Sequence, residues 1–272
     1  KCAYKPHWES SVGATIPMIR KAREQGLDVT CDQYPYNAGS TTITCNFPSW
    51  AFEGGVDAML ARLRDPETRA VLREQSNASH EGRWCDIYVA YVQTEKNRWM
   101  VGKSITEIAQ ALGGKDPADT CFDIVLEENN HVGEINFGMC EEDIEYIMSQ
   151  PFVMPGSDGE AMPLTAPGKP HPRNFGTFVR VLAHYCRDRA LFPLETAVQK
   201  MTSLPASRIG LSDRGVLKEG MWADLVLFDP ETQRTKALLK LLQRTEYALF
   251  MSGTPLENRV EEMCFLVSCL QV

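Results

Sequence analysis

The sequence is poor in histidine, in net positive charge and in long apolar runs. Only five of its 272 residues are histidine, and the formal net charge is −8 with a pI of about 5.3. An acidic chain of this kind argues against a nucleic-acid-binding surface spread over the whole molecule. No apolar run approaches the roughly 20 residues that a membrane-spanning helix requires. We therefore expect neither a membrane span nor a nucleic-acid partner.

Paired cysteine motifs and targeting signals are also missing. The nine cysteines are an odd number, and no two of them form a Cys-x-x-Cys pair. This usage is typical of reduced thiols, so we expect buried, apolar cysteines and a cytoplasmic location. The first residues do not follow the signal-peptide pattern of basic start, apolar middle and small-residue cleavage site. The chain begins with Lys1 rather than methionine, which favours an internal fragment of a longer protein.

Hydrophobic spacing predicts an α/β chain that is long enough to bury a real core. Residues 11–25 have apolar side chains at helical spacing ahead of Gly26, and a strand is predicted next at 27–31. A helix followed by a strand is half of a repeating βα unit. Further strands are predicted at 87–92, 135–138 and 152–156. Further helices are predicted at 56–75, 104–112, 117–127, 141–150, 176–190 and 193–203.

The most informative stretch lies between residues 152 and 230. A short apolar run at 152–154 ends in Pro155-Gly156-Ser157-Asp158-Gly159. A buried strand that presents one carboxylate at its C-terminal tip, between glycines, is how a barrel enzyme displays a catalytic or metal-binding group. The alternation within residues 215–229 favours a hairpin in a separate small β-domain.

An ordered set of motifs covers most of the chain. The segments are Asp32-Gln33-Tyr34-Pro35-Tyr36 with the following residues 37–41, Phe137-Gly138-Met139 with residues 141–143, Gly156-Ser157-Asp158-Gly159, Pro170-His171-Pro172-Arg173, and Lys200-Met201-Thr202-Ser203-Leu204-Pro205-Ala206. Over residues 1–232 this set resembles the amidohydrolase superfamily and, within it, the N-acyl-D-amino-acid deacylases (D-aminoacylases). The resemblance implies the C-terminal part of a TIM-type (β/α)8 metallo-hydrolase barrel at 1–205, a lid-like insertion at 42–130 and part of a small β-sandwich at 206–232.

The resemblance also implies a reaction, the hydrolysis of an N-acyl-D-amino acid to a carboxylate and a free D-amino acid by metal-activated water. Asp158 matches the family's general base, which can also contact the metal. Arg173 matches the arginine whose planar guanidinium binds the substrate α-carboxylate. Tyr34 and Ser40 match hydroxyls of the same carboxylate pocket, and Lys1 matches a lysine that helps to hold the carboxylate. From the residues alone, a turn aspartate, a surface salt bridge, a turn serine and a tyrosine packed on the barrel rim remain alternatives.

Zinc is the metal that the resemblance implies, but the sequence lacks most of its ligands. The family's His-x-His motif, its bridging Cys or carboxylated Lys and two further histidines match nothing in this chain. Asp158 alone cannot hold Zn²⁺, because a catalytic zinc takes three protein ligands. We therefore expect the chain as given to lack bound zinc and deacylase activity, and to need the missing N-terminal half of the barrel.

The five histidines do not supply the missing ligands. His7, His80, His131 and His184 show no metal-ligand spacing among themselves, and an isolated histidine is usually a hydrogen-bonded or surface residue. His171 is expected at the mouth of the pocket, with a structural role equally open.

The sequence changes character after residue 232. Residues 234–242 predict a basic amphipathic helix, and Ser252-Gly253-Thr254-Pro255 with Asn258 resembles a motif of helicase-like remodelling ATPases. We interpret residues 233–272 as an α/β fragment of such an ATPase, joined to the deacylase part near 232–235. No Gly-x-x-x-x-Gly-Lys-Ser/Thr loop is present, so a Walker-type ATP site cannot be assembled.

Two alternatives to the hydrolase interpretation stay open. One is a non-catalytic chimeric product whose open barrel leaves apolar strand edges exposed. The other is a fragment of a nucleic-acid-dependent helicase-like ATPase.

Overall fold

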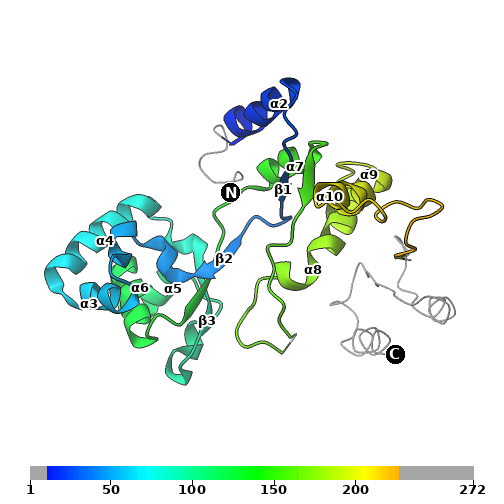
Figure 1. The fold of residues 1–272 in the computed structure, drawn as a ribbon. Coiled ribbons are helices and arrows are strands. Elements are labelled where there is room, and N and C mark those ends of the chain that lie inside the picture. Colours follow the sequence, from blue (N-terminus) through cyan, green and yellow to red (C-terminus); the bar gives the residue numbers. More distant parts are fainter. Residues whose placement is uncertain (1–10, 164, 227–272) are drawn as a thin grey trace.

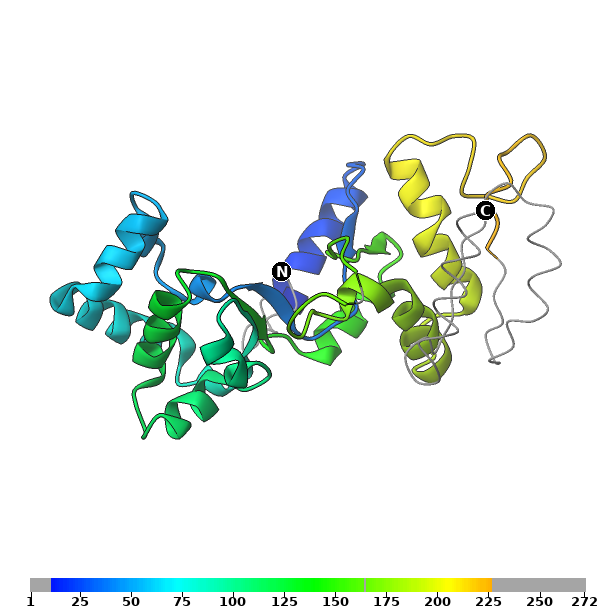
Figure 2. The same ribbon diagram turned by 90° about the horizontal axis from the view of Figure 1, so that it is seen from below.

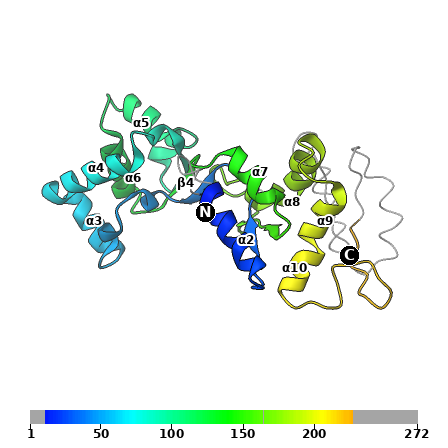
Figure 3. The same ribbon diagram turned by 90° about the horizontal axis from the view of Figure 1, so that it is seen from above.

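The computed structural model describes residues 11–163 and 165–226. Lys1, His7 and the predicted helicase-like segment 233–272 lie outside the described residues. Figure 1 shows two bodies connected through strand β2. We call residues 39–136 the insertion, and residues 11–38 and 137–226 the α/β body. The turned views in Figure 2 and Figure 3 show the same two bodies side by side, with the helices of the insertion far from α9 and α10.

The α/β body is built on a two-stranded parallel sheet of β1 and β5, in which Cys31 pairs with Val153 and Gln33 with Pro155. Helix α2 precedes β1, and helices α7 and α8 precede and follow β5, as in a βα repeat. Its elements are the π-helix η1 (Ser11–Thr15), α2 (Ile16–Glu24), β1 (Cys31–Gln33), α7 (Glu141–Ser149), β5 (Val153–Pro155), α8 (Arg173–Arg180), the π-helix η6 (Val181–Asp188), α9 (Leu194–Met201) and α10 (Ser203–Arg208).

The insertion has its own antiparallel sheet in the order β2-β4-β3, with a bulge in β3 between Val89 and Tyr91. Four helices and several 3₁₀ turns surround this sheet. Its elements are β2 (Gly39–Thr42), η2 (Ile43–Asn46), η3 (Ser49–Phe52), α3 (Val56–Arg64), α4 (Pro66–His80), η4 (Trp84–Asp86), β3 (Ile87–Val92), η5 (Glu95–Met100), α5 (Ile105–Ala111), α6 (Pro117–Glu127) and β4 (Val132–Asn136).

Each body buries a separate apolar core. In the insertion, Trp84 and Phe122 are almost fully buried, and Phe47 meets Phe122 edge to face at 5.0 Å between ring centroids. In the α/β body, Ile144 and Tyr185 lie at the centre of the second core. Because it has a core of its own, the insertion is a folded unit rather than a loose loop. Its role as a lid stays a prediction.

Local chemistry explains where the long predicted helix at 56–75 breaks. Asp65 stands between α3 and α4, and its carboxylate accepts a hydrogen bond from the backbone N–H of Thr68 at 2.9 Å. Pro66 follows at the first position of α4, where its missing N–H costs nothing. The cap and the proline therefore start a new helix instead of continuing α3. A capping box of Ser104 and Glu107 starts α5 in a related way.

Several other predicted elements are confirmed or corrected. The helices predicted at 11–25, 104–112, 117–127, 141–150 and 193–203 and the strands at 87–92 and 152–156 are present. The strand predicted at 27–31 lies instead at β1. The strand predicted at 135–138 is β4, which starts earlier and pairs antiparallel within the insertion. The helix predicted at 176–190 begins at Arg173 and ends as the π-helix η6.

The hairpin predicted at 215–229 stays a prediction, because residues 227–229 lie outside the described residues and Leu225 forms a β-bridge. Residues 215–226 contain no named strand, and Gly215 and Gly220 adopt the left-handed φ values of turns. The side chains of Leu217 and Trp222 are 86% and 63% exposed. Within the described residues these side chains are largely exposed, and alternation without a buried face does not by itself fix a strand. Among the described helices, none is both long and apolar enough to cross a bilayer.

Lys200, from the Lys-Met-Thr-Ser-Leu-Pro-Ala motif, holds α7 and β5 together. Its side chain is buried, and its ammonium donates hydrogen bonds to the backbone carbonyls of Gln150 and Val153, the latter at 2.9 Å. We expect Lys200→Ala to lower the free energy of unfolding by about 2–3 kcal/mol, because two buried carbonyls lose their donor and a cavity forms. Urea unfolding followed by circular dichroism measures this change. Lys21→Ala, at an exposed position of α2, is the control, and an equal effect of both changes would contradict this role.

Candidate functional site

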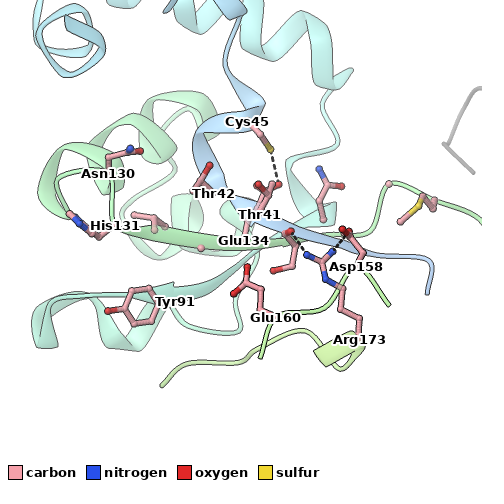
Figure 4. Close-up of a pocket in the computed structure, with 17 residues that line it drawn as sticks. Thr41, Thr42, Cys45, Tyr91, Asn130, His131, Glu134, Asp158, Glu160 and Arg173 are labelled. Atoms are coloured by element: carbon pink, nitrogen blue, oxygen red, sulfur yellow. Dashed lines mark hydrogen bonds and ion pairs between the residues drawn. The ribbon is translucent and has the colours of Figure 1, made fainter. Parts of the chain in front are cut away.

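A cavity of about 820 Å³ lies where the two bodies meet. Its walls come from β2 and β4 of the insertion, from the loop after β5 and from the start of α8. The polar side chains in this wall include Ser40, Glu134, Asp158, Glu160 and Arg173, and Figure 4 shows them from one side. Three of the residues that the sequence singled out, Ser40, Asp158 and Arg173, therefore line one cavity.

Arg173 is the residue around which the candidate site is arranged. It is the first residue of α8, and only 8% of it is exposed. Its Nη2 donates to the backbone carbonyl of Ser40 at 3.1 Å, and its Nη1 lies 3.0 Å from Oδ2 of Asp158. The centre of the guanidinium is 5.8 Å from the ring centroid of Tyr34, a cation–π distance. The structure thus gathers Tyr34, Ser40 and Asp158 around one buried cation.

Two N–H groups of Arg173 lack a hydrogen-bond acceptor among the described residues. Nε and Nη1 are both buried, and the approach of Nη1 to Asp158 is an ion pair without hydrogen-bond geometry. Buried polar groups are nearly always hydrogen-bonded, and an unsatisfied donor costs roughly 1–3 kcal/mol. An anion that enters the cavity could satisfy these donors. Unsatisfied N–H groups on an arginine in a cavity wall are what we expect of an arginine that binds a carboxylate.

The Gly156-Ser157-Asp158-Gly159 loop packs closely against β1 and α8. A Cβ atom on Gly156 would lie 2.7 Å from the Asp32 carboxylate, and one on Gly159 would lie 2.9 Å from the backbone oxygen of Arg173. At Gly159 the neighbour is backbone, so that position requires glycine, whereas at Gly156 the Asp32 side chain would have to move aside. Asp158 itself has φ +49°, in the left-handed region that costs energy for a non-glycine residue. The loop holds the Asp158 side chain about half exposed, at the edge of the cavity.

Tyr34 and Ser40 both contact Arg173, but neither does so through its side-chain hydroxyl. The Tyr34 hydroxyl donates to the backbone carbonyl of Ala38 at 2.7 Å, so its ring rather than its oxygen faces Arg173. Tyr34 lines a separate cavity of about 290 Å³, which Asp158 also borders. Ser40 binds the guanidinium through its backbone oxygen. A direct contact of either hydroxyl with a ligand stays a prediction.

His171 positions the start of α8. It is 2% exposed, its Nδ1 accepts the backbone N–H of Arg173 at 3.0 Å, and its Nε2 lies 2.9 Å from the Ala38 carbonyl. A backbone N–H can only donate, so Nδ1 carries no proton and Nε2 donates to Ala38. Both ring nitrogens are thereby used in the fold. The structural role that the sequence left open for His171 is the one that the geometry supports.

Glu134, at the centre of β4, was missed by sequence reasoning. It is only 1% exposed, one carboxylate oxygen accepts from the Cys45 thiol at 3.1 Å, and the other accepts from the Asn46 side-chain amide. Burial raises its pKa to about 7, and the hydrogen bonds from Cys45, Asn46 and Asn136 offset this only in part. The alternation in β4 contained the signal, because Glu134 shares the buried face of the strand with Val132.

The described residues do not by themselves fit a zinc site. They contain no group of three or more His, Cys, Asp or Glu side chains that could hold a metal ion. His131 borders the large cavity without other histidines beside it, and His80 stacks on Trp84 at 4.5 Å. A catalytic zinc needs three protein ligands, and Asp158 is at most one of them.

Comparisons with known proteins identify the family. The sequence profile described as the amidohydrolase family matches residues 25–245. The chain belongs to the amidohydrolase family. This amidohydrolase chain is 35% identical over 246 residues to the D-aminoacylase of Alcaligenes xylosoxydans xylosoxydans. The aligned region covers 89% of this chain and 41% of that protein. It is also 35% identical over 233 residues to the N-acyl-D-glutamate deacylase of the same organism, which covers 85% and 38%.

Solved structures of the family agree with this assignment. The N-acyl-D-glutamate deacylase of Bordetella bronchiseptica, complexed with zinc and a phosphonate inhibitor, superposes with a TM-score of 0.58 at 30% identity, over 83% of this chain and 37% of that one. A D-aminoacylase structure gives 0.57 at 35% identity, over 84% and 38%. These neighbours support a TIM-type metallo-hydrolase fold. The chain spans about two fifths of the length of these relatives. The family match continues past residues 232–235, and the predicted join there stays a prediction.

The raised pKa of Glu134 predicts that this residue's own contribution to the free energy of unfolding is more favourable in acid. Below about pH 4.5 both the folded and the unfolded chain hold the proton of Glu134, and burial then carries no ionic penalty. Between pH 4.5 and about 7 the unfolded chain loses this proton first, so the free energy of unfolding falls as the pH rises, by up to about 3 kcal/mol. Urea unfolding at pH 5 and pH 8 measures this slope.

Glu134→Gln, which removes the titrating group, should flatten the slope. Glu67→Gln, at an exposed position in the first turn of α4, should leave it in place. A slope that is the same in the wild type and in Glu134→Gln would show that Glu134 is not its source.

Proposed function

We propose that this chain supplies the substrate-carboxylate site and the general base of a hydrolase that cleaves N-acyl-D-amino acids. The observation that carries the proposal is the buried Arg173 guanidinium, which lines a large cavity beside Asp158 and keeps two N–H groups without hydrogen-bond acceptors in the described residues. The relatives named D-aminoacylase and N-acyl-D-glutamate deacylase support the same class of reaction.

In this proposal Arg173 binds the α-carboxylate of the substrate. A guanidinium matches a carboxylate through two parallel hydrogen bonds, and each such charged bond contributes more than a neutral one. The α-carboxylate and the amide nitrogen are attached to the same Cα atom, so binding at Arg173 brings the amide near Asp158. The Asp158 carboxylate takes a proton from the attacking water and returns it to the leaving nitrogen.

Zinc belongs to the proposal as a family property only. In the Bordetella bronchiseptica structure zinc is bound, and such an ion supplies Lewis-acid polarisation of a carbonyl group. Since the described residues do not form a zinc site, we derive no step through the metal. We propose that the chain as given binds the small-molecule substrate and needs the N-terminal half of the barrel to hydrolyse it. No disulfide joins the six described cysteines, which fits the reducing, cytoplasmic location in the same proposal.

Arg173→Met tests the proposal through binding. We expect the affinity for N-acetyl-D-leucine to fall at least tenfold, because two charged hydrogen bonds of about 1.5–3 kcal/mol each are lost. Isothermal titration calorimetry measures this affinity. N-acetyl-L-leucine is the control ligand, and it should bind the wild type more weakly. Arg214→Met removes an arginine that pairs with Asp224 outside the cavity and should change nothing.

Two results would reject the proposal. One is an Arg173→Met variant that folds and binds the D-ligand as tightly as the wild type. The other is equal affinity of the wild type for the D- and L-ligands.

A further inference from the structure

We infer that the large cavity selects N-acyl-D-amino acids whose side chain ends in a cation, with Glu134 as the group that receives it. This inference rests on the proposed function, since it assumes that Arg173 holds the α-carboxylate. The cavity wall contains the carboxylates of Glu134, Asp158 and Glu160 against the single guanidinium of Arg173. A ligand that brings only a negative charge would neutralise the one cation and leave the carboxylates facing one another.

Glu134 is an acid without a basic partner among the described residues. Of the ion pairs in the described part of the chain, none includes Glu134, and its donors Cys45, Asn46 and Asn136 are all neutral. A carboxylate offers about four acceptor sites, so three donors still leave room for another. Burying a carboxylate without an opposite charge is costly, and an entering ammonium or guanidinium would remove part of that cost.

The strand register places Glu134 close to the Arg173 contact. In the β2–β4 ladder Thr41 pairs with Glu134, and Ser40, whose carbonyl binds Arg173, pairs with Ile135. Paired residues of antiparallel strands lie roughly 4.5–5.5 Å apart between Cα atoms. Glu134 is therefore one residue along the ladder from the anchored guanidinium. Figure 4 shows its carboxylate below Cys45 and in the same part of the cavity as the Arg173–Asp158 pair.

A side chain of lysine type has the reach that this geometry requires. With bonds of about 1.5 Å, its ammonium lies roughly 6 Å from Cα when the chain is extended. A substrate anchored by its carboxylate at Arg173 could thus place the ammonium at Glu134. An acidic side chain in the same place would meet a like charge. This chain would accordingly prefer a different substrate from the relatives named for N-acyl-D-glutamate and N-acyl-D-aspartate.

The test compares three ligands of similar length on the full chain. Binding of N-acetyl-D-lysine, N-acetyl-D-norleucine and N-acetyl-D-glutamate is measured by calorimetry at pH 8, above the pKa of about 7 for Glu134. We expect the lysine ligand to bind at least tenfold tighter than the norleucine ligand, and the glutamate ligand to bind most weakly. Equal affinities for lysine and norleucine, or a preference for glutamate, would overturn the inference without any variant.

Glu134→Gln separates the charge from the shape of the pocket. In this variant we expect the preference for lysine over norleucine to shrink to about twofold or less, while norleucine binding stays within about threefold of the wild type. Glu160→Gln, at another carboxylate of the cavity wall, should retain most of the preference. A preference that persists in Glu134→Gln would overturn the assignment to Glu134.

Failure of the proposed function gives a different pattern. If no ligand binds in a way that depends on Arg173, the proposed function and this inference both fall. If norleucine binds through Arg173 but lysine gains nothing, only the inference falls.

Discussion

The buried guanidinium of Arg173 is the interaction on which the candidate site depends. It connects the first turn of α8 with the backbone of β2 at Ser40, with the loop that carries Asp158 and with the ring of Tyr34. His171 fixes the start of the same helix through the backbone N–H of Arg173. A charge buried this deeply must be paired or hydrogen-bonded. In our proposal, its incomplete set of partners lets this site bind an anion.

The site lies at a junction because neither body could form it alone. The α/β body supplies Asp158 and Arg173, while the insertion supplies Ser40 and the buried Glu134. Pockets often form between such units, where polar groups from both can converge. The result is a cavity with a cation near its α/β wall and an uncompensated acid on β4. In our proposal this polarity, more than the fold, decides which members of one substrate class fit the cavity.

Sequence reasoning predicted the parts that local patterns encode. Strongly periodic segments such as α6 and β3 lie where expected, and the motif residues Ser40, Asp158 and Arg173 do meet in one cavity. The pairing of β2 with β4 was not predicted, because it joins segments more than 90 residues apart and no local pattern specifies a partner. Glu134 was missed for another reason: the strand predicted at 135–138 began after it, so its place on the same face as Val132 was not recognised.

The most direct test of this account observes the Arg173 side chain itself. A proton–nitrogen correlation spectrum of the arginine Nε–H groups, assigned with Arg173→Lys, is recorded during titration with N-acetyl-D-lysine and with its L-enantiomer. If the buried Nε–H or the neighbouring Nη1–H donates a hydrogen bond to the substrate carboxylate, the Arg173 signal shifts with saturation for the D-ligand and far less for the L-ligand. If the D-ligand binds while the Arg173 signal stays unchanged, the carboxylate is held elsewhere and the account is wrong.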